Sequence, residues 1–225
     1  ELFDIIHHQD ESENWVSGIG EKKGRFYSVI VADTLAFMHR RKYVFRDLKP
    51  ENILIDKDGY PVLTDFGFTK RVTDKTFTFC GTPNYLPPEI VANRGHGISA
   101  DNWSLGVLIY ELIEGENPFF YEGMDQMALF ESICNDTYYP VEAKTSKESL
   151  DLIDRLLEKD PNQRLGTFRE KDILDHKWFR YCDMKKFRDR KIEAPWKPGP
   201  VSLHSEAIEE GSEGEEEDYS SGEEE

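Results

Sequence analysis

The chain has 225 residues, of which 45 are acidic and 28 are basic, and its formal net charge at pH 7 is -17. Residues 206–225 hold 11 of the acidic side chains and no basic one, so residues 1–205 carry 34 acids against 28 bases. This balance argues against a basic face for nucleic acid. No apolar run approaches the roughly 20 residues that span a bilayer, and a hydrophobic content of 38% suffices for one ordinary core.

The cysteines and the chain start indicate a soluble intracellular protein. Cys80, Cys134 and Cys182 lie far apart and form neither a CxxC metal pair nor a disulfide framework, so we expect free thiols. The start ELFDIIHHQD lacks the basic-then-apolar pattern of a targeting segment. We expect the protein in the cytoplasm, and also in the nucleus. Because the chain begins at Glu1 without methionine, inside an expected helix, we expect a fragment of a longer protein.

The first half of the chain predicts a helix followed by a small hairpin. Residues 25–41 place apolar side chains at spacings of three and four, which suits a helix buried on one broad face. Two short β-rich runs, 52–56 and 61–65, flank the turn Lys57-Asp58-Gly59, a pattern typical of a hairpin. Residues 66–99 show no sustained period, so we expect a long loop, and loops of that length are usually functional.

The second half predicts a helical body and an acidic tail. Residues 101–114 are apolar nearly all round, as expected of a helix at the centre of a helical domain. Further helices are expected at 124–135, 147–158 and 170–176. After Ala194 the chain becomes rich in Pro and then in Glu, Ser and Gly, which bury too little apolar area to offset chain entropy.

One ordered set of polar residues carries the chemistry. In the segment VFRDLKPENIL (44–54), Asp47 lies in a turn after a buried helix and Lys49 follows two residues later. Asn52 and Asp65 lie at the facing ends of the expected hairpin. Together they bring an acceptor, a cation and two oxygen ligands to one place. Two oxygen ligands are too few to enclose an ion, but they suit Mg²⁺, which keeps its other coordination positions for phosphate and water. The metal is therefore expected to arrive with a nucleotide.

These residues resemble the signature of the eukaryotic protein kinases, which is a catalytic loop of the HRD type, then DFG, then APE. The sequence is most similar to the AGC-type serine/threonine kinases, the group of the cAMP- and cGMP-dependent kinases. The resemblance runs from Glu1 to about Pro198 and is supported by TDFGFTKRV (64–72), FCGTPNYLPPEI (79–90), DNWSLGVLIYEL (101–112), DPNQRLG (160–166) and DHKWF (175–179).

The resemblance implies a mainly α (α+β) fold, that of the C-terminal lobe of a kinase, helical with a small β-hairpin at the catalytic cleft. It divides the chain into a partial kinase domain at 1–179, an AGC-type C-terminal extension at 180–205 and an acidic disordered tail at 206–225. The small lobe, with its Gly-rich loop, would precede Glu1. The nearest alternative, Gly18-Ile19-Gly20, is rejected as a nucleotide loop because its spacing is wrong and it is expected to follow a polar loop, not a strand.

The same resemblance implies catalytic roles. Asp47 would accept the proton of the substrate hydroxyl, and Lys49 would balance charge on the γ-phosphoryl group of ATP. Asn52 and Asp65 would hold Mg²⁺. Thr82, together with Lys49, argues for serine or threonine as the acceptor. For the nucleotide, the matching residues are Glu1 at the ribose and Leu54 and Thr64 beneath the adenine.

Regulation and substrate choice are also implied. Thr78 matches the activation-loop threonine, whose phosphate would add about -1.5 to -2 charge and pair with Arg46. Glu51 and Glu111 match carboxylates that pair with arginine upstream of the target residue, which implies basophilic substrates.

Three further matches are structural, and three positions depart from the usual pattern. Glu89 and Arg164 should form a buried ion pair, and Asp101 should bond the backbone of the catalytic loop. The departures are Phe45 for His or Tyr, Asn84 for Glu, and Pro87 for Ala in APE. None of them removes a catalytic group.

Two functions remain open. The first is a serine/threonine kinase of which this chain is a fragment, inactive by itself. Its partners would be protein substrates with arginine upstream of Ser/Thr, an upstream activating kinase, and a regulatory subunit or cyclic-nucleotide-binding domain. The second is a catalytically silent, pseudokinase-like module that binds substrates or partners.

Overall fold

The computed structural model describes residues 1–9, 15–141 and 144–199, and the acidic tail expected at 206–225 lies outside the described residues. The helices in this part of the chain are α1 (Leu2–Ile6), α2 (Gly20–His39), α3 (Pro88–Val91), α4 (Ser99–Glu114), α5 (Gln126–Asn135), α6 (Lys147–Leu156), α7 (Lys171–Leu174) and α8 (Met184–Arg188). The strands are β1 (His7–Gln9), β2 (Trp15–Ser17), β3 (Tyr43–Val44), β4 (Ile53–Ile55), β5 (Pro61–Leu63) and β6 (Lys70–Arg71). They form antiparallel pairs β1-β2, β3-β6 and β4-β5, which confirms a mainly helical α+β fold.

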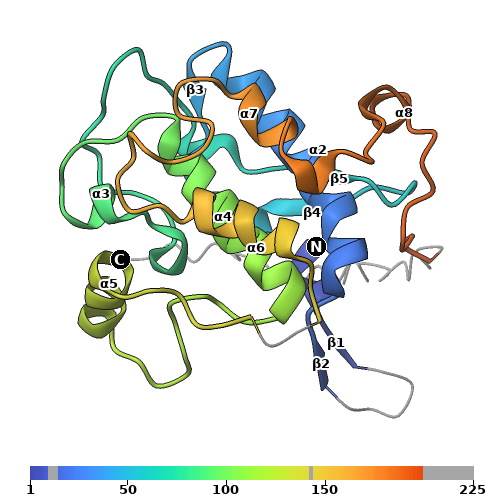
Figure 1. Ribbon diagram of the computed structural model, residues 1–225, viewed down its shortest axis with the longest axis horizontal. Helices are drawn as coiled ribbons and strands as arrows, with labels where there is room; N and C mark the ends of the chain where they lie inside the picture. Colours follow the sequence, from blue (N-terminus) through green and yellow to red (C-terminus); the bar gives the residue numbers. More distant parts are fainter. Residues whose placement is uncertain (10–14, 142–143, 200–225) are drawn as a thin grey trace, which may run out of the picture.

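Helix α4 forms the centre of the core. All of its residues except Glu114 are buried, and it contacts both α2 and α6 (Figure 1). The close approach of α6 depends on Gly106 of α4, because a Cβ atom at Gly106 would lie 2.9 Å from the Cβ of Leu156 in α6. Trp103 stacks on Phe119 with ring centroids 5.3 Å apart. The prediction of a central helix at 101–114 is therefore confirmed, because a helix that is apolar all round needs neighbours on every side.

The predicted hairpin is also present. Strands β4 and β5 pair with Leu54 opposite Val62, and the carboxylate of Asp56 accepts hydrogen bonds from the backbone N–H groups of Asp58 and Tyr60 in the turn. Because side chains alternate along a strand, Ile53 and Leu63 face the core while Leu54 and Val62 stay exposed.

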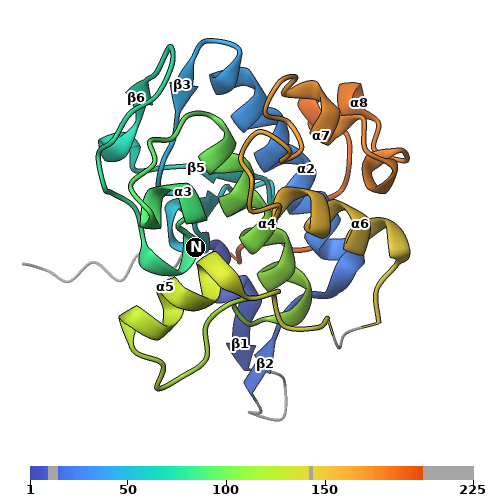
Figure 2. The same cartoon turned by 60° about the vertical axis from the view of Figure 1, so that its left-hand side comes forward.

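Two expectations for the N-terminal region were wrong. The second helix begins at Gly20 and not at residue 25, and Gly18-Ile19-Gly20 follows strand β2 and not a polar loop. The β1-β2 hairpin projects from one end of the molecule (Figure 2). Gly18 serves packing, because a Cβ atom there would lie 2.7 Å from the carbonyl oxygen of Ile113.

The long segment 66–99 contains only short elements. It includes the 3-10 turns at Phe66–Phe68 and Pro83–Tyr85, strand β6 and helix α3. Strand β6 pairs with β3 outside the segment, and within the segment Thr76 forms an isolated antiparallel bridge with His96. Within the described residues, the cysteines are free and no helix combines the length and apolarity needed to cross a bilayer.

Candidate active site

Asp47 lies at the centre of a hydrogen-bonded cluster. Its side chain is 6% exposed, and its Oδ1 accepts from the backbone N–H (3.0 Å) and the hydroxyl (2.9 Å) of Thr82. Its Oδ2 accepts from Nδ2 of Asn52 at 2.8 Å and lies 3.4 Å from Nζ of Lys49. Lys49 in turn donates to the Thr82 hydroxyl at 2.8 Å. The structure thus brings together three of the four residues predicted to meet at one place, Asp47, Lys49 and Asn52, and adds Thr82, which the resemblance implied. The donors hold the carboxylate in a single orientation.

The two predicted metal ligands keep oxygen atoms available. The side-chain Nδ2 of Asn52 donates to Asp47, so the side-chain oxygen of Asn52 is not used in this interaction. Asp65 is exposed, has a left-handed backbone (φ 54°), and uses Oδ1 to cap the following turn at the Gly67 N–H. The backbone N–H of Thr64 donates to the carbonyl of Asn52 at 2.9 Å, so the two ligands lie on adjoining strand ends.

This donor set fits a metal that is only partly held by protein. Among the described residues, no group of three or more His, Cys, Asp or Glu side chains could hold an ion by itself. Two oxygen donors at a cleft match Mg²⁺, which prefers to keep water and phosphate oxygens in its remaining positions. The residues therefore fit the predicted metal only together with a phosphate ligand.

Asp101 positions the turn that carries Asp47. Its two carboxylate oxygens accept from the backbone N–H groups of Phe45 and Arg46, both at 2.8 Å. Oδ2 also lies 2.7 Å from Nε2 of His39, and both side chains are 1% exposed. Arg46 needs this support, because its backbone has a φ of 72°, a left-handed conformation that is costly for a residue with a Cβ atom. The interaction expected between Asp101 and the loop backbone is present.

The residues predicted to contact a nucleotide lie on or next to the β4-β5 hairpin. Leu54 is 45% exposed beside Thr64, whose hydroxyl donates to the carbonyl of Asn52. Glu1 precedes α1, which packs against β4, and its side chain joins the capping box of that helix. Phe66, in the 3-10 turn after β5, is a further exposed apolar residue, at 53%. Leu54 and Phe66 are therefore large apolar side chains that the described part of the chain leaves exposed.

Of the two glutamates predicted to bind substrate, Glu111 contacts Tyr85 directly. The Tyr85 hydroxyl donates to Oε2 of Glu111, and Nε2 of His7 lies 3.5 Å from Oε1 of the same carboxylate. Burial raises the pKa of Tyr85 well above its usual value, and the negative charges of Glu111 and Glu51 raise it further. Glu111 is 7% exposed, whereas Glu51 is exposed.

Thr78 lies next to Thr76 on the exposed side of the loop. Thr78 is exposed, and its hydroxyl lies 3.5 Å from that of Thr76, which accepts from Nζ of Lys70 at 2.9 Å. Arg46 donates through Nε to the carbonyl of Phe68 at 2.6 Å. No direct hydrogen bond joins Arg46 to Thr78 in the described part of the chain, so the expected pairing would need the phosphate itself.

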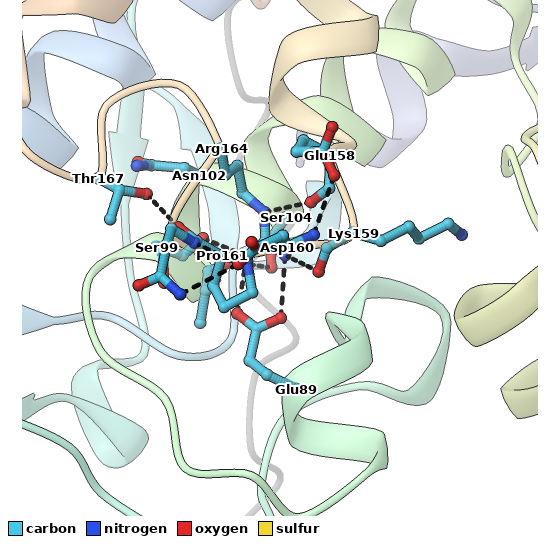
Figure 3. A network of polar contacts seen from close by, with 12 residues as sticks. Glu89, Ser99, Asn102, Ser104, Glu158, Lys159, Asp160, Pro161, Arg164 and Thr167 are labelled. Atoms are coloured by element: carbon cyan, nitrogen blue, oxygen red, sulfur yellow. Dashed lines mark hydrogen bonds and ion pairs between the residues drawn. The ribbon is translucent and has the colours of Figure 1, made fainter.

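Glu89 and Arg164 form the expected ion pair. Arg164 donates through Nη1 and Nη2 to the two oxygens of Glu89 at 2.7 and 2.9 Å, and the two side chains are 0% and 2% exposed. Figure 3 shows that backbone carbonyls surround the guanidinium, including those of Ser99 and Glu158 at 2.9 Å. The pair joins α3 to the loop after α6.

Sequence reasoning missed four residues of this region: His7, Lys70, Tyr85 and His96. Tyr85 and Lys70 lie inside sequence stretches that support the resemblance, but the residues next to them in the sequence do not indicate which side chains they contact. His7 and His96 gave no signal, because an isolated histidine acquires its neighbours only when distant segments fold together.

Comparison with known proteins points in one direction. A family model described as protein kinase domain matches residues 1–179. The chain is 40% identical over 185 residues to "cAMP-dependent protein kinase catalytic subunit 2" of Drosophila melanogaster. The matched stretch covers 81% of this chain and 52% of that protein. It is 41% identical over 180 residues to the human "cAMP-dependent protein kinase catalytic subunit PRKX", covering 78% and 49%. It is 38% identical over 191 residues to "cGMP-dependent protein kinase 2" of Rattus norvegicus, covering 80% and 24%. The chain therefore spans about half the length of the first two relatives and less of the third.

Proposed function

Because this chain belongs to the protein kinase family, within the AGC type, we propose that it is the larger lobe of a serine/threonine kinase that transfers the γ-phosphoryl group of ATP to proteins. The observation that carries this proposal is the cluster of Asp47, Lys49, Asn52 and Thr82. The alternative, a silent binding module, is favoured by the exposed apolar surface at Leu54, which a partner could cover.

In the proposed reaction, Asp47 orients the substrate hydroxyl and accepts its proton. Thr82 and Asn52 hold its carboxylate in place, so little reorganisation is needed when the substrate arrives. Lys49 keeps its ammonium group beside the reacting oxygen and offsets negative charge on the transferred group. Because Thr82 forms hydrogen bonds with both Asp47 and Lys49, it links the loop that carries Thr78 to the turn that carries Asp47.

Asn52 and Asp65 are the residues proposed to hold Mg²⁺. Their side-chain oxygens would hold the ion, which would supply positive charge against the phosphates of ATP. The chain itself contributes the two oxygen donors, while Leu54, Thr64 and Glu1 form the lower wall of the proposed nucleotide site. The upper wall would come from a small lobe.

We assign basophilic specificity to Glu51 and Glu111. Support comes from burial and neighbours: Glu111 is held by Tyr85, and Glu51 lies close enough to influence the same hydroxyl. Two carboxylates near one aromatic ring suit the guanidinium of an arginine upstream of the phosphorylated residue. The proposed substrates are therefore proteins with arginine before the target serine or threonine.

Thr78 is the proposed regulatory site. Its exposure makes it available to an upstream kinase, and Arg46 carries the matching charge next to Asp47. The proposed domain limits stay at 1–179, 180–205 and 206–225. A regulatory subunit or a cyclic-nucleotide-binding domain is the proposed controlling partner, and the cytoplasm, with the nucleus, is the proposed location.

The decisive experiment measures phosphotransfer from ATP to a serine peptide rich in arginine. It uses the complete protein that contains this chain, the Asp47→Asn variant, and Asp58→Asn as a matched change at an exposed turn. We expect activity that Asp47→Asn lowers by about 10²–10⁴-fold, the usual contribution of a general base, while Asp58→Asn leaves it unchanged. Silence of the unaltered protein would favour the binding module, and equal activity of all three would remove Asp47 from the proposed catalytic role.

Substrate choice is tested separately with Glu111→Gln and the exposed control Glu116→Gln. Loss of a charge-assisted hydrogen bond should lower the preference for arginine peptides by about tenfold or more. An arginine preference that survives Glu111→Gln would remove Glu111 from the substrate site without affecting the proposed chemistry.

A further inference from the structure

The C-terminal part of the described chain carries a local excess of positive charge. Residues 177–197 hold eight of the 28 basic side chains and only three acidic ones, a net charge of +5. The rest of residues 1–205 holds 20 bases against 31 acids, a net charge of -11. Helix α8 belongs to this stretch and lies at one side of the molecule (Figure 1). A positive surface on an otherwise acidic protein is suited to an anionic partner.

Six of these cations form what we call the basic surface: Lys177, Arg180, Lys185, Lys186, Lys191 and Lys197. No ion pair joins Lys177, Arg180 or Lys197 to a carboxylate within the described residues. The guanidinium of Arg180 instead lies 4.5 Å from the ring centroid of Tyr181, a residue that is 75% exposed. These three cations are therefore available to an anion.

The other three lysines of the basic surface have only weak partners. Lys185 and Lys191 share the carboxylate of Asp189, at 3.1 and 3.2 Å, and Lys186 lies 3.7 Å from Asp183. All three lysine side chains are exposed, and exposed ion pairs contribute only about 0–1 kcal/mol. Their ammonium groups can therefore turn toward a more highly charged anion at little cost.

Two arginines of the same stretch hold the basic surface in place. Arg188 donates through Nε and Nη2 to the two oxygens of Asp33, at 2.8 and 2.6 Å. Arg190 donates to Asp56 and Asp58, in the turn of the β4-β5 hairpin. The hydrogen bonds to Asp33 and Asp56 raise the pKa of the two guanidinium groups. These arginines anchor α8 to the body of the protein, so the lysines around them are presented from a fixed position.

The chain itself contains a complementary anion. Residues 206–225 hold 11 acidic side chains and no basic one. The last described residues return to the basic surface, because Cγ of Lys197 would lie 3.3 Å from a Cβ atom on Gly59, in the turn that holds Arg190. From residue 199, where the description of this segment ends, seven residues lead to 206, and they can span at most about 25 Å. The acidic segment is therefore within reach of the basic surface.

We propose that the acidic segment 206–225 binds to the basic surface of the same molecule. Because the segment is tethered, its effective concentration at the surface is about millimolar, so weak contacts suffice. The charges are exposed, so their attraction should fall with salt, as the Debye length shortens from about 10 Å at 0.1 M to about 3 Å at 1 M. The bound segment would compete with any other anion for the surface.

The first test is a cross-linking experiment on the full 225-residue chain. A water-soluble carbodiimide activates a carboxylate, and a lysine amine in contact with it displaces the activating group as a urea and forms an amide. Mass spectrometry of the digest identifies the lysines joined to the segment 206–225. We expect links to Lys185, Lys186 and Lys191 that decrease as salt is raised from about 0.1 to 1 M. Lys75 and Lys144, which are exposed on other elements, are the internal controls and should not be linked.

A second measurement uses a labelled peptide of residues 206–225 and a neutral-tail chain, in which all 11 acidic side chains of the segment are replaced by their amides. The peptide should bind the neutral-tail chain about tenfold or more tightly than the natural chain, because the tethered segment occupies the surface in the latter. Adding Lys185→Glu, Lys186→Glu and Lys191→Glu to the neutral-tail chain should abolish binding, whereas Lys75→Glu with Lys144→Glu should leave it unchanged. Circular dichroism checks that each variant keeps its helical content.

Three results would overturn the proposal. The first is cross-links spread evenly over all exposed lysines, and the second is equal affinity of the peptide for the natural and neutral-tail chains. The third is binding of phosphatidylserine vesicles to both chains to the same extent, which would show that the basic surface is open to a membrane and not occupied by the segment. None of these measurements requires phosphotransfer, so their outcome is independent of the proposed kinase activity.

Discussion

The buried ion pair between Glu89 and Arg164 allows a quantitative test of the fold. In Glu89→Gln, one carboxylate oxygen becomes an amide N–H₂ that faces a guanidinium N–H, so one hydrogen bond is replaced by opposed donors. The Arg164 charge then remains in a site that is 0% exposed, where the carbonyls of Ser99, Glu158 and Lys159 bond it but carry no full negative charge. Breaking such a pair from one side costs about 3–5 kcal/mol.

This cost is large compared with the stability of a domain, which is about 5–15 kcal/mol. In urea denaturation with a slope of about 1–3 kcal/mol per molar, it should lower the midpoint by about 1–5 M. The matched control is Glu170→Gln, which removes the same charge from a more accessible pair in which Arg40 lies 4.0 Å away and the two side chains are 44% and 26% exposed. Exposed pairs contribute about 0–1 kcal/mol, so the control should shift the midpoint only slightly.

The double variant Glu89→Leu with Arg164→Met gives a further check. Replacing both charges by apolar side chains removes the uncompensated charge, so the double variant should be more stable than Glu89→Gln. If Glu89→Gln costs less than about 1 kcal/mol, as little as an exposed pair, the reasoning from burial is refuted. A double variant less stable than the single one would show that the hydrogen bonds to the carbonyls matter more than the charge.

Three further predictions concern other polar groups. Burial alone would raise the pKa of Glu21, but hydrogen bonds from Trp178 and Ser146 and the charge of Arg25 outweigh it and lower the pKa from 4.5. Glu21→Gln should therefore cost about 1–3 kcal/mol near neutral pH, and in thermal melts this cost should shrink as the pH falls below 4.5, because a depressed pKa stabilises the fold only while the group is ionised. Burial raises the pKa of the thiols of Cys80, Cys134 and Cys182, so iodoacetamide should label them more slowly in the native chain than in urea. Asp101→Asn should speed hydrogen exchange at the amides of Phe45 and Arg46, because one of their two acceptors is lost.

Each of these predictions has a clear contrary result. A penalty for Glu21→Gln that stays constant down to strongly acidic pH would mean that its charge contributes nothing. A cysteine labelled at its denatured rate in the native chain would contradict the effect of burial on its thiol. Unchanged exchange at Phe45 and Arg46, with faster exchange elsewhere, would show that Asp101 supports the fold generally and not the catalytic turn.

Sequence alone determined the elements whose cause is local or strongly periodic. The turn Lys57-Asp58-Gly59 predicted the β4-β5 hairpin, because Gly59 adopts the left-handed backbone (φ 86°) that such a turn needs. The unbroken apolar surface of α4 predicted a central helix, and Asp47, Lys49, Asn52 and Asp65 were singled out by their order in the chain. In these cases the signal lies within a few residues, so it survives without knowledge of the fold.

Only the tertiary structure decided which distant groups meet. The β1-β2 hairpin was missed because its strands have three residues each, too few for a period, and Gly18 is explained only by its contact with the end of α4. The partners of Glu111, Tyr85 and His7, come from segments 26 and 104 residues away in the chain, and the burial of His96 depends on the loop that folds over it. Charge and burial act over distances in space, and the sequence records only distances along the chain.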